Sequence, residues 1–220
     1  YGTVSQLGFM MLLVGTGEYK IAQAGIVLLL AHGAFKATLF MLVGIIDHQV
    51  GTRHIRELHG FGNGWMPVKA MAVIGAASMA GMPPLLGFVA KEKAIDAYLE
   101  YGDFAGSSAT LVVIIAGSVL TFAYSARFVL GVFGAYGTPD HEVHSRSAPA
   151  PSAIFVAPAA VLTVLTVMVG LFPVAISDLT KAALLSLDPD ASPSTVKLWA
   201  GFNAAFVISL GIIATGTLLV

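Results

Sequence analysis

Residues 25–46 constrain the fold of this chain most, because they form an apolar stretch long enough to cross a lipid bilayer. With the two residues that follow, the stretch reads GIVLLLAHGAFKATLFMLVGIIDH. A helix rises ~1.5 Å per residue, so residues 25–46 would be about 33 Å long, and a bilayer span needs roughly 20 apolar residues. We therefore expect a transmembrane helix over residues 21–46.

Two ionisable residues, His32 and Lys36, lie near the middle of this span. Their spacing places both on one helix face, about one turn apart. A charge at the bilayer centre costs roughly 2.5–3.5 kcal/mol. Keeping a lysine of reference pKa ~10.4 neutral at pH 7 costs about 4.6 kcal/mol. Because the two penalties are comparable, we expect the proton on Lys36 to be exchangeable, with His32 as its exchange partner.

The alternative interpretation of this pair is purely structural. The histidine would bond a backbone carbonyl, and the long stem of the lysine would carry its charge to the membrane surface. Lys36 precedes Ile46, the end of the apolar stretch, by ~15 Å along a helix, which is far for a lysine side chain to reach. The pattern therefore favours a proton relay.

The composition of the whole chain indicates a membrane protein. Hydrophobic residues make up 57% of the 220 residues and charged residues only 10%, against about 25% charged in soluble domains. The net charge is −1 without a basic run, so nothing indicates a nucleic-acid partner. The lack of cysteine excludes thiolate metal sites. Both ends fall inside apolar patterns, and we expect an internal fragment of a longer subunit.

Hydropathy and turn residues predict an all-α, polytopic transmembrane helical bundle that forms a single membrane domain over residues 1–220. We expect about six spans, one of them discontinuous, and one helix lying along the membrane surface. The expected spans are residues 3–14, 21–46, 67–90 with a break at 83–84, 104–133, 153–171 and 196–220, and the expected surface helix is 172–187.

The third span is predicted to be broken at Pro83 and Pro84, because adjacent prolines remove two amide donors from a helix. A discontinuous helix is tolerated at membrane depth only where protein or water satisfies the freed backbone groups. Lys91 follows the break and would lie beside those groups. The alternative is an interfacial lysine paired with Glu92 or Asp96, and spacing alone does not decide between them.

Two further groups of polar residues have ordinary interpretations. His48, His54 and His59 lie in the polar connector 47–66, but their spacing is not that of a metal-ligand set. We therefore expect no metal or cofactor here, and a solvated loop that packs on neighbouring subunits. Tyr124 and Arg127, near the end of the fourth span, are typical of an anchor at the membrane surface.

Several motifs, in this order, resemble the antiporter-like membrane subunits shared by Mrp-type cation/proton antiporters and respiratory complex I. The motifs are YGTVSQLGFM at residues 1–10, HGAFKATLF at 32–40, GFVAKEK at 87–93, and Tyr124 with Arg127, which match the family's Y-x-x-R element. Two others, DHQVGTR at 47–53 and LWAGFN at 198–203, resemble the large A subunit of Mrp antiporters in particular.

The resemblance implies a row of lysines and histidines at mid-membrane depth that moves protons through water. It assigns Lys91 to the terminal lysine of this row, and Lys36 with His32 to the helix that bridges it. Possible supporting residues are Glu92, Tyr124, Arg127, Asp47 and His48.

The resemblance thus implies a non-enzymatic subunit of a bacterial plasma-membrane antiporter, which exchanges Na⁺ or another monovalent cation for protons. Its expected partners are the other membrane subunits of a hetero-oligomeric complex, the transported ions and the lipid bilayer. One alternative is a proton-pumping subunit of a complex I type redox complex. Another is a membrane scaffold whose polar residues only hold helices together. A small excess of Arg and Lys favours the connector side as cytoplasmic.

Overall fold

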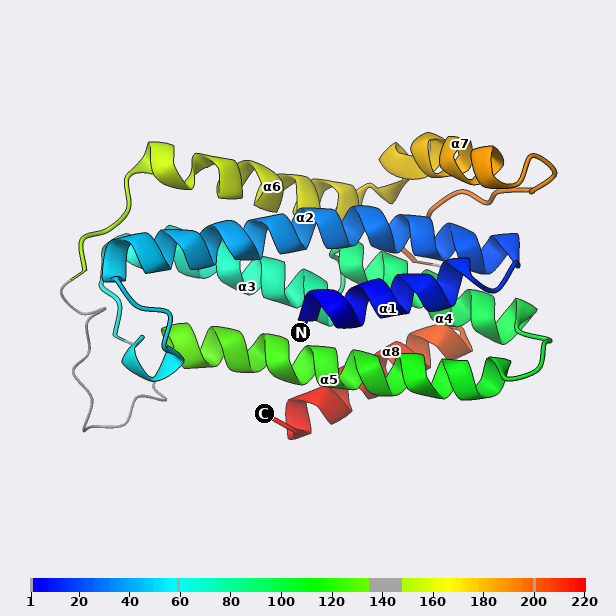
Figure 1. Cartoon of the computed structure of the whole chain (residues 1–220), viewed down its shortest axis with the longest axis horizontal. Coiled ribbons are helices and arrows are strands. Elements are labelled where there is room, and N and C mark those ends of the chain that lie inside the picture. The colour runs from blue at the N-terminus through cyan, green and yellow to red at the C-terminus, as the bar shows by residue number, and fades with distance from the viewer. Residues whose placement is uncertain (1, 59, 135–147, 200) are drawn as a thin grey trace.

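The computed structural model describes residues 2–58, 60–134, 148–199 and 201–220. Over these ranges every regular element is a helix, and α2 (Tyr19–Val50) runs the length of the molecule (Figure 1). The predicted all-α membrane bundle is confirmed. The other elements are α1 (Gly2–Val14), η1 (Ile55–Glu57), η2 (Asn63–Trp65), α3 (Met66–Ala80), α4 (Leu86–Tyr101), α5 (Ser107–Phe133), α6 (Ala153–Leu171), η4 (Pro173–Ile176), α7 (Ser177–Leu187) and α8 (Ala204–Leu218), where η denotes a 3₁₀ turn.

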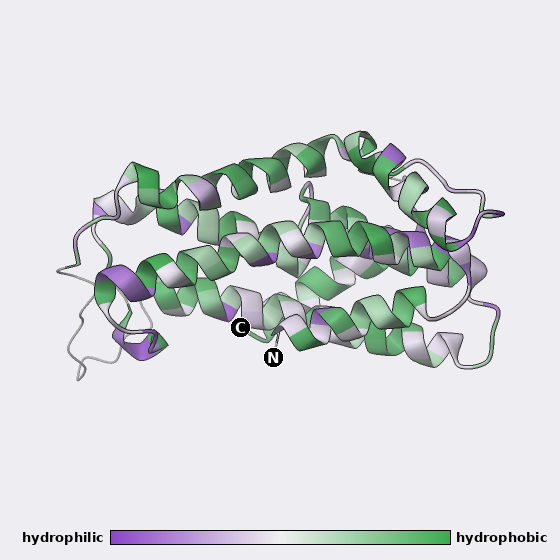
Figure 2. Cartoon of the chain, turned by 45° about the horizontal axis from the view of Figure 1, so that its top comes forward, coloured by the Kyte–Doolittle hydropathy of each residue, from purple (hydrophilic) through white to green (hydrophobic). Residues whose placement is uncertain are grey.

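Three of the described helices, α2, α5 and α6, are long and apolar enough to cross a membrane on their own. Hydrophobic residues follow the helices along their length, and hydrophilic residues gather toward the two ends of the bundle (Figure 2). Large apolar side chains such as Phe40, Val112 and Val164 are exposed on the outside of the bundle. Contiguous exposed apolar surface is unusual for a soluble protein and suits contact with lipid.

Helix α2 is the centre of the bundle. It packs against α1, α3, α4, α6 and α7. Leu28, Ala31 and Phe35 of α2 are fully buried in one core with Val89 and Ala90 of α4. Burial of each such aliphatic or aromatic side chain is worth roughly 1.5–3 kcal/mol in water, but between membrane helices close packing supplies the stabilisation instead.

Local capping explains why α2 is longer than the predicted 21–46. The Glu18 carboxylate accepts a hydrogen bond from the Lys20 amide at 3.3 Å and so caps the first turn. At the other end, Gly51 has a φ of 82° and donates its amide to the Asp47 carbonyl, the usual way in which glycine ends a helix.

Three other elements also differ from the expected bounds. The helix after the break continues to Tyr101, well past residue 90. The expected surface helix 172–187 is divided into the 3₁₀ turn η4 and the short helix α7. The last helix begins at Ala204 rather than 196, because the Asn203 side chain caps it by accepting the Phe206 amide at 2.8 Å.

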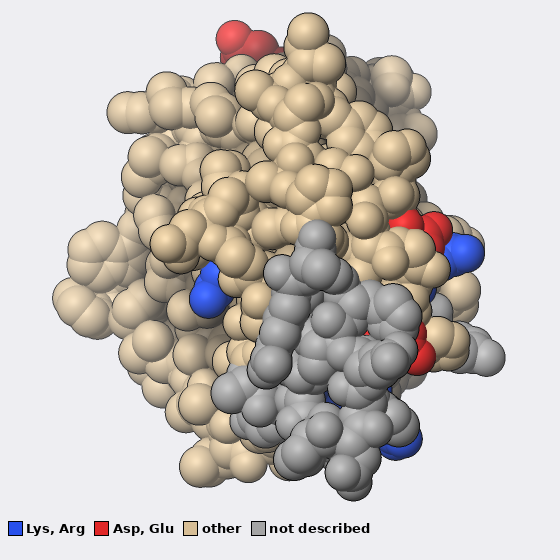
Figure 3. Space-filling model, turned by 90° about the vertical axis from the view of Figure 1, so that its left-hand side faces the viewer, with Lys and Arg blue, Asp and Glu red and all other residues tan. Residues whose placement is uncertain are grey.

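The connector after α2 forms one end of the bundle. Viewed from this end, the described surface is mostly uncharged, with charged groups at a few separate places (Figure 3). Leu58 and Trp65 of the connector are buried, and the Trp65 indole donates to the Ala148 carbonyl at 3.3 Å. The connector is therefore partly folded back onto the bundle rather than solvated throughout. His59 lies outside the described residues.

Candidate functional site

Helices α3 and α4 form one discontinuous helix that is interrupted at residues 81–85. Gly81, with a φ of 86°, ends α3 by donating its amide to the carbonyls of Ala77 and Ser78. After the break, the Gly87 amide in the first turn of α4 donates to the Ser78 hydroxyl at 3.2 Å. Ser78 of α3 therefore satisfies one of the free amides at the start of α4.

Close backbone packing fixes the geometry of the break. A β-carbon at Gly87 would overlap the Ser78 carbonyl oxygen. From the neighbouring helix α6, Gly170 packs so tightly on the break that a β-carbon there would lie 2.6 Å from the Pro84 carbonyl oxygen. Both positions require glycine because a backbone atom, which cannot rotate away, occupies the space.

Lys91 fills the interior side of the break. Its side chain comes from α4 and is only 5% exposed, and its ammonium donates to the carbonyls of Met79 at 3.0 Å and Ala80 at 3.2 Å. These carbonyls belong to the last turn of α3, where a helix carries partial negative charge. The break therefore supplies polar partners for a cation that has no carboxylate within ion-pair distance among the described residues.

This geometry rejects the alternative in which Lys91 is an interfacial lysine paired with Glu92 or Asp96. Glu92 is itself buried, at 4% exposed, and its Oε1 atom has no hydrogen-bond partner in the described part of the chain. Two adjacent residues of α4 thus place an ammonium and a carboxyl group inside the bundle on separate faces.

A second polar group lies where α1, α2 and α5 meet. Lys36 is half-buried, and a β-carbon placed on Gly2 of α1 would lie 3.0 Å from its Nζ atom and 3.2 Å from the Tyr124 hydroxyl. The ends of the Lys36 and Tyr124 side chains therefore lie beside one another. Tyr124 points into the bundle, so the interpretation of Tyr124 as a surface anchor is wrong.

His32 lies one turn before Lys36 on the same helix face. It is 8% exposed, its ring meets Phe35 edge to face at 5.6 Å, and its Nε2 atom has no hydrogen-bond partner among the described residues. The structure thus brings His32, Lys36 and Tyr124 into one polar region, while Lys91 lies on α4, against which α2 packs.

Sequence reasoning missed the polar residues that line this region. Gln6 of α1 is 1% exposed and donates to the Thr121 hydroxyl of α5 at 3.4 Å, while its Oε1 atom is unpaired among the described residues. Ser118, Thr121 and Ser125 form a buried stripe on α5. Their spacing of three and four residues was the available signal, because it predicts one helix face.

Unpaired buried polar atoms are the feature that the two regions share. They are Gln6 Oε1, His32 Nε2, Glu92 Oε1, Ser118 Oγ and the Tyr124 hydroxyl, all without a partner in the described ranges. Buried polar atoms are nearly always bonded to protein or to ordered water. An interior with several such atoms can therefore hold hydrogen-bonded water between its ionisable side chains.

Arg127 lies one turn after Tyr124 on α5 and is exposed. With Tyr124 and with Arg56 of the connector, it lines a pocket of about 600 Å³. The other candidate residues lie at the connector end. Asp47 pairs with Arg53 at 3.3 Å, and the ring of the exposed His48 lies 5.1 Å from that of Phe155. Among the described residues, no three His, Asp or Glu side chains are placed to hold a metal ion.

These features define a polytopic helical membrane protein with a discontinuous helix and ionisable groups inside its bundle. Residues 1–121 match the NADH:quinone oxidoreductase/Mrp antiporter transmembrane family. The chain belongs to this family, which confirms the resemblance seen in its motifs.

Individual relatives agree with this assignment. The chain is 31% identical to the A1 subunit of a Na(+)/H(+) antiporter of Staphylococcus saprophyticus, over 100% of this chain and 30% of that protein. It is 34% identical to a subunit of a probable K(+)/H(+) antiporter of Rhizobium meliloti, over 98% of this chain and 22% of that protein. It also matches a chain in the structure of the Mrp complex from Dietzia sp. DQ12-45-1b, with a TM-score of 0.82, 34% identity, and coverage of 100% of this chain and 23% of that chain. The chain thus spans less than a third of the length of these relatives.

Proposed function

We propose that this chain is part of a membrane subunit of a monovalent cation/proton antiporter, and that it moves protons along its interior. The observation that carries the proposal is the burial of the Lys91 ammonium at the break between α3 and α4. An ionisable side chain inside a membrane bundle is costly and usually serves transport. The names of the S. saprophyticus and R. meliloti relatives support cation/proton exchange as the process.

The break can accommodate Lys91 in either protonation state. When it is protonated, the carbonyls of Met79 and Ala80 accept its hydrogen bonds and the end of α3 offsets the positive charge. When it is neutral, the cost of burying a charge disappears. A neighbouring charge or water that alters the balance can therefore load or release the proton.

Lys36 and His32 would serve as the next groups along α2. One helical turn separates them, and the Tyr124 hydroxyl lies beside Lys36, so protons would pass between them through intervening water. Gln6, Ser118 and Thr121 would hold the intervening water, because hydroxyl and amide groups both donate and accept hydrogen bonds. The cation, the stoichiometry and the cation's route belong to the complete complex.

The Lys-bearing helices would work inside a hetero-oligomer in a bacterial plasma membrane. The Mrp complex that contains the structural relative supports this assembly. Exposed apolar side chains on α5 and α6 are available for lipid or for other membrane subunits. An exchange of unequal charge would also draw on the membrane potential, at ~2.3 kcal/mol per charge per 100 mV.

A second candidate function is proton pumping in a redox complex. It follows from the family description, which includes NADH:quinone oxidoreductase. The interior of the chain would act in the same way, but electron transfer elsewhere in the complex would drive the protons.

One vesicle experiment separates the two functions. Inverted membrane vesicles that contain the full-length complex are energised by respiration, and the pH gradient is followed with a fluorescent amine while Na⁺ or K⁺ is added. An antiporter discharges the gradient when the cation is added. If neither cation has an effect and a redox substrate instead builds the gradient through this complex, the antiporter function is wrong.

A further inference from the structure

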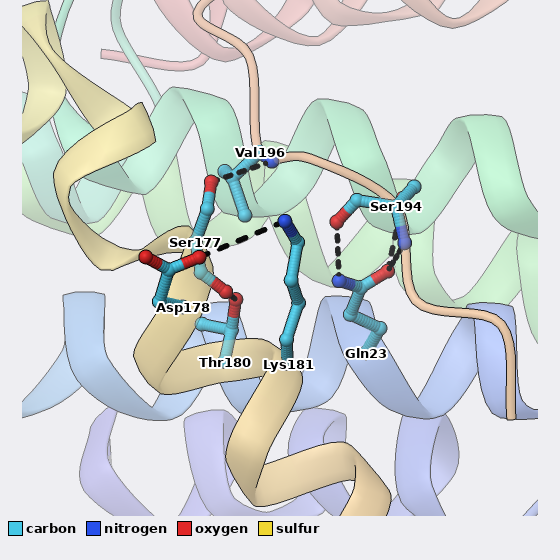
Figure 4. Close-up of polar contacts among 7 residues, drawn as sticks. All are labelled: Gln23, Ser177, Asp178, Thr180, Lys181, Ser194 and Val196. Carbon is cyan, nitrogen blue, oxygen red and sulfur yellow. Dashed lines mark hydrogen bonds and ion pairs between the residues drawn. The ribbon is translucent and has the colours of Figure 1, made fainter.

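An extended segment crosses the end of the bundle opposite the connector. It comprises residues 188–199, between α7 and the start of α8, and is called the strap below. Gln23 of α2 holds it by three hydrogen bonds to Ser194, at 2.7, 3.1 and 2.9 Å, and the Ser177 hydroxyl of α7 accepts the Val196 amide at 3.0 Å (Figure 4). Gln23 is fully buried, so the strap has a fixed position on the bundle.

A polar pocket of about 300 Å³ lies between the strap and α4. Glu92, Lys93 and Asp96 of α4 line one side, and Ser194, Thr195 and Lys197 of the strap line the other. The Lys93 ammonium bridges the two sides by donating to the Ser194 hydroxyl at 2.8 Å. A second pocket, of about 200 Å³, shares Lys93, Asp96 and Ser194 and extends toward Lys20 and Glu100.

Glu92 is the most deeply buried ionisable group that lines this pocket. The residue is 4% exposed, lines the pocket, and has an Oε1 atom without a hydrogen-bond partner in the described ranges. It is adjacent to Lys91 on α4. Toward the outside, Asp96 and Glu100 follow Glu92 at intervals of four residues, so the three carboxyl groups lie on one face of α4. Their exposure increases from Glu92 to Glu100, which is exposed.

The charges around the pocket do not fit a bound metal cation. Taken together, the two pockets are lined by three lysines, Lys20, Lys93 and Lys197, and by three carboxyl groups, Glu92, Asp96 and Glu100, so positive and negative groups are equal in number. The Lys93 ammonium also reaches across the pocket to the Ser194 hydroxyl, which places a positive charge among the possible ligands. A balanced set of donors and acceptors around a small, partly open space instead fits water, which hydrogen-bonds to both kinds of group.

We propose that the strap pocket is the opening through which protons pass between Lys91 and the aqueous phase, with Glu92 as the group that carries them. The proposal rests on the proton path proposed above. In one direction the Lys91 ammonium gives its proton, through water, to the Glu92 carboxylate, and the resulting carboxylic acid releases it to water in the pocket. The reverse steps load Lys91. With the connector side in the cytoplasm, the strap pocket faces the outside.

Access is tested first, with single cysteines in the full-length complex. The chain itself contains no cysteine, and accessible cysteines elsewhere in the complex are replaced. Thr195→Cys is treated with a membrane-impermeant, positively charged methanethiosulfonate, applied separately to each face of the membrane. Modification from one face only, with a fall in cation-driven proton flux of at least about tenfold, is expected; tenfold corresponds to ~1.4 kcal/mol of added barrier. A reducing agent should restore the flux.

Ser186→Cys is the matched control for the labelling. Ser186 is exposed on α7, outside the pocket, so its modification should leave the flux unchanged. If modified Thr195→Cys transports at the unmodified rate, the pocket is not the opening and the proposal is overturned.

The role of Glu92 is tested with one substitution that removes its ionisable group and one that keeps a carboxyl group on a shorter side chain. Glu92→Gln keeps the size and the hydrogen bonding of the side chain but cannot take up a proton, so flux per assembled complex should fall at least about tenfold. Glu92→Asp keeps a carboxyl group and should retain a measurable part of the flux. Asp178→Asn, an exposed carboxylate on α7, is the control.

Opposite results would indicate a structural role. If Glu92→Gln transports like the wild type while Glu92→Asp fails, the side chain only fills space, and the proposal is wrong. The wild-type flux separates this failure from that of the antiporter function. If the wild type exchanges cations for protons and the Glu92 and Thr195 variants do so equally well, only the proposal that the strap pocket is the opening is wrong. If the wild type shows no exchange, the antiporter function is wrong as well.

Discussion

The ammonium group of Lys91 donates a hydrogen bond to the carbonyl oxygen of Met79 at 3.0 Å, across a break in the same membrane helix. The break thus has two linked effects on the backbone carbonyl groups at the end of α3. It leaves carbonyl groups at the end of α3 without helical partners, and it brings a lysine from α4 to satisfy them. A buried cation and an interrupted helix, each costly alone in a membrane, offset one another here.

The cap on α4 gives a first prediction, about stability. Ser78→Ala removes the hydroxyl that accepts the Gly87 amide, and loss of a helix cap costs about 1 kcal/mol. The purified complex should therefore melt at a lower temperature, and transport should fall because Met79 and Ala80 are no longer held in register with Lys91. Ser186→Ala, an exposed serine on α7, should change neither. Equal melting curves for Ser78→Ala and the wild type would contradict the capping role.

A second prediction concerns the contact between α6 and the break. In Gly170→Ala the new methyl group would meet the Pro84 carbonyl at 2.6 Å, and such overpacking costs about 1–3 kcal/mol. The yield of assembled complex, measured by size-exclusion chromatography, should decrease. Gly211→Ala in α8 is the matched control, because a β-carbon there meets nothing within 4 Å. A Gly170→Ala complex that assembles like this control would show that α6 can move away freely.

A third prediction separates transport from scaffolding at α2. His32→Ala and Lys36→Ala should each lower the transport rate per assembled complex at least about tenfold, because each removes an ionisable group from the path. Tyr124→Phe, which removes only the hydroxyl beside Lys36, should have a smaller effect. A membrane scaffold predicts the opposite pattern, in which assembly falls and the rate per assembled complex is unchanged. Quantitative immunoblotting of the vesicles supplies the amount of complex.

The connector end gives a fourth prediction, of a small effect. The Asp47 and Arg53 side chains are 39% and 73% exposed, and exposed ion pairs are worth about 0–1 kcal/mol. Asp47→Asn should therefore lower the melting temperature only slightly, and less so at high salt. Because the structure places Asp47 away from Lys36 and Lys91, transport should remain close to wild type. A loss as large as that of Lys36→Ala would show that Asp47 belongs to the proton path.

Local chemistry explains what the sequence revealed of the fold and the site. The break could be predicted because Pro83 and Pro84 forbid a regular helix wherever they occur. The common helix face of His32 and Lys36 could be predicted because it depends only on helical spacing. Neither inference needs knowledge of the neighbouring helices.

The remaining features depend on which helices meet. The partners of Lys91 are carbonyls on the other half of a broken helix, and any residue has a carbonyl, so no side-chain pattern marks Met79 and Ala80. Gln6 is an ordinary polar residue of a membrane helix until α5 brings Thr121 against it. The hydrogen bonds between Gln23 and Ser194 of the strap connect residues that are 171 positions apart. The sequence has no local signal for such a contact.

The most direct test of the account is the cation-dependent discharge of a pH gradient in vesicles with wild-type complex, Lys91→Ala and Lys69→Ala. Lys69 is an exposed lysine on α3, the other half of the broken helix, and controls for loss of a positive charge. At equal assembly, the wild type and Lys69→Ala should discharge the gradient when Na⁺ or K⁺ is added, and Lys91→Ala should not. Discharge by Lys91→Ala at the wild-type rate would contradict the central claim that the lysine at the break carries the transported proton.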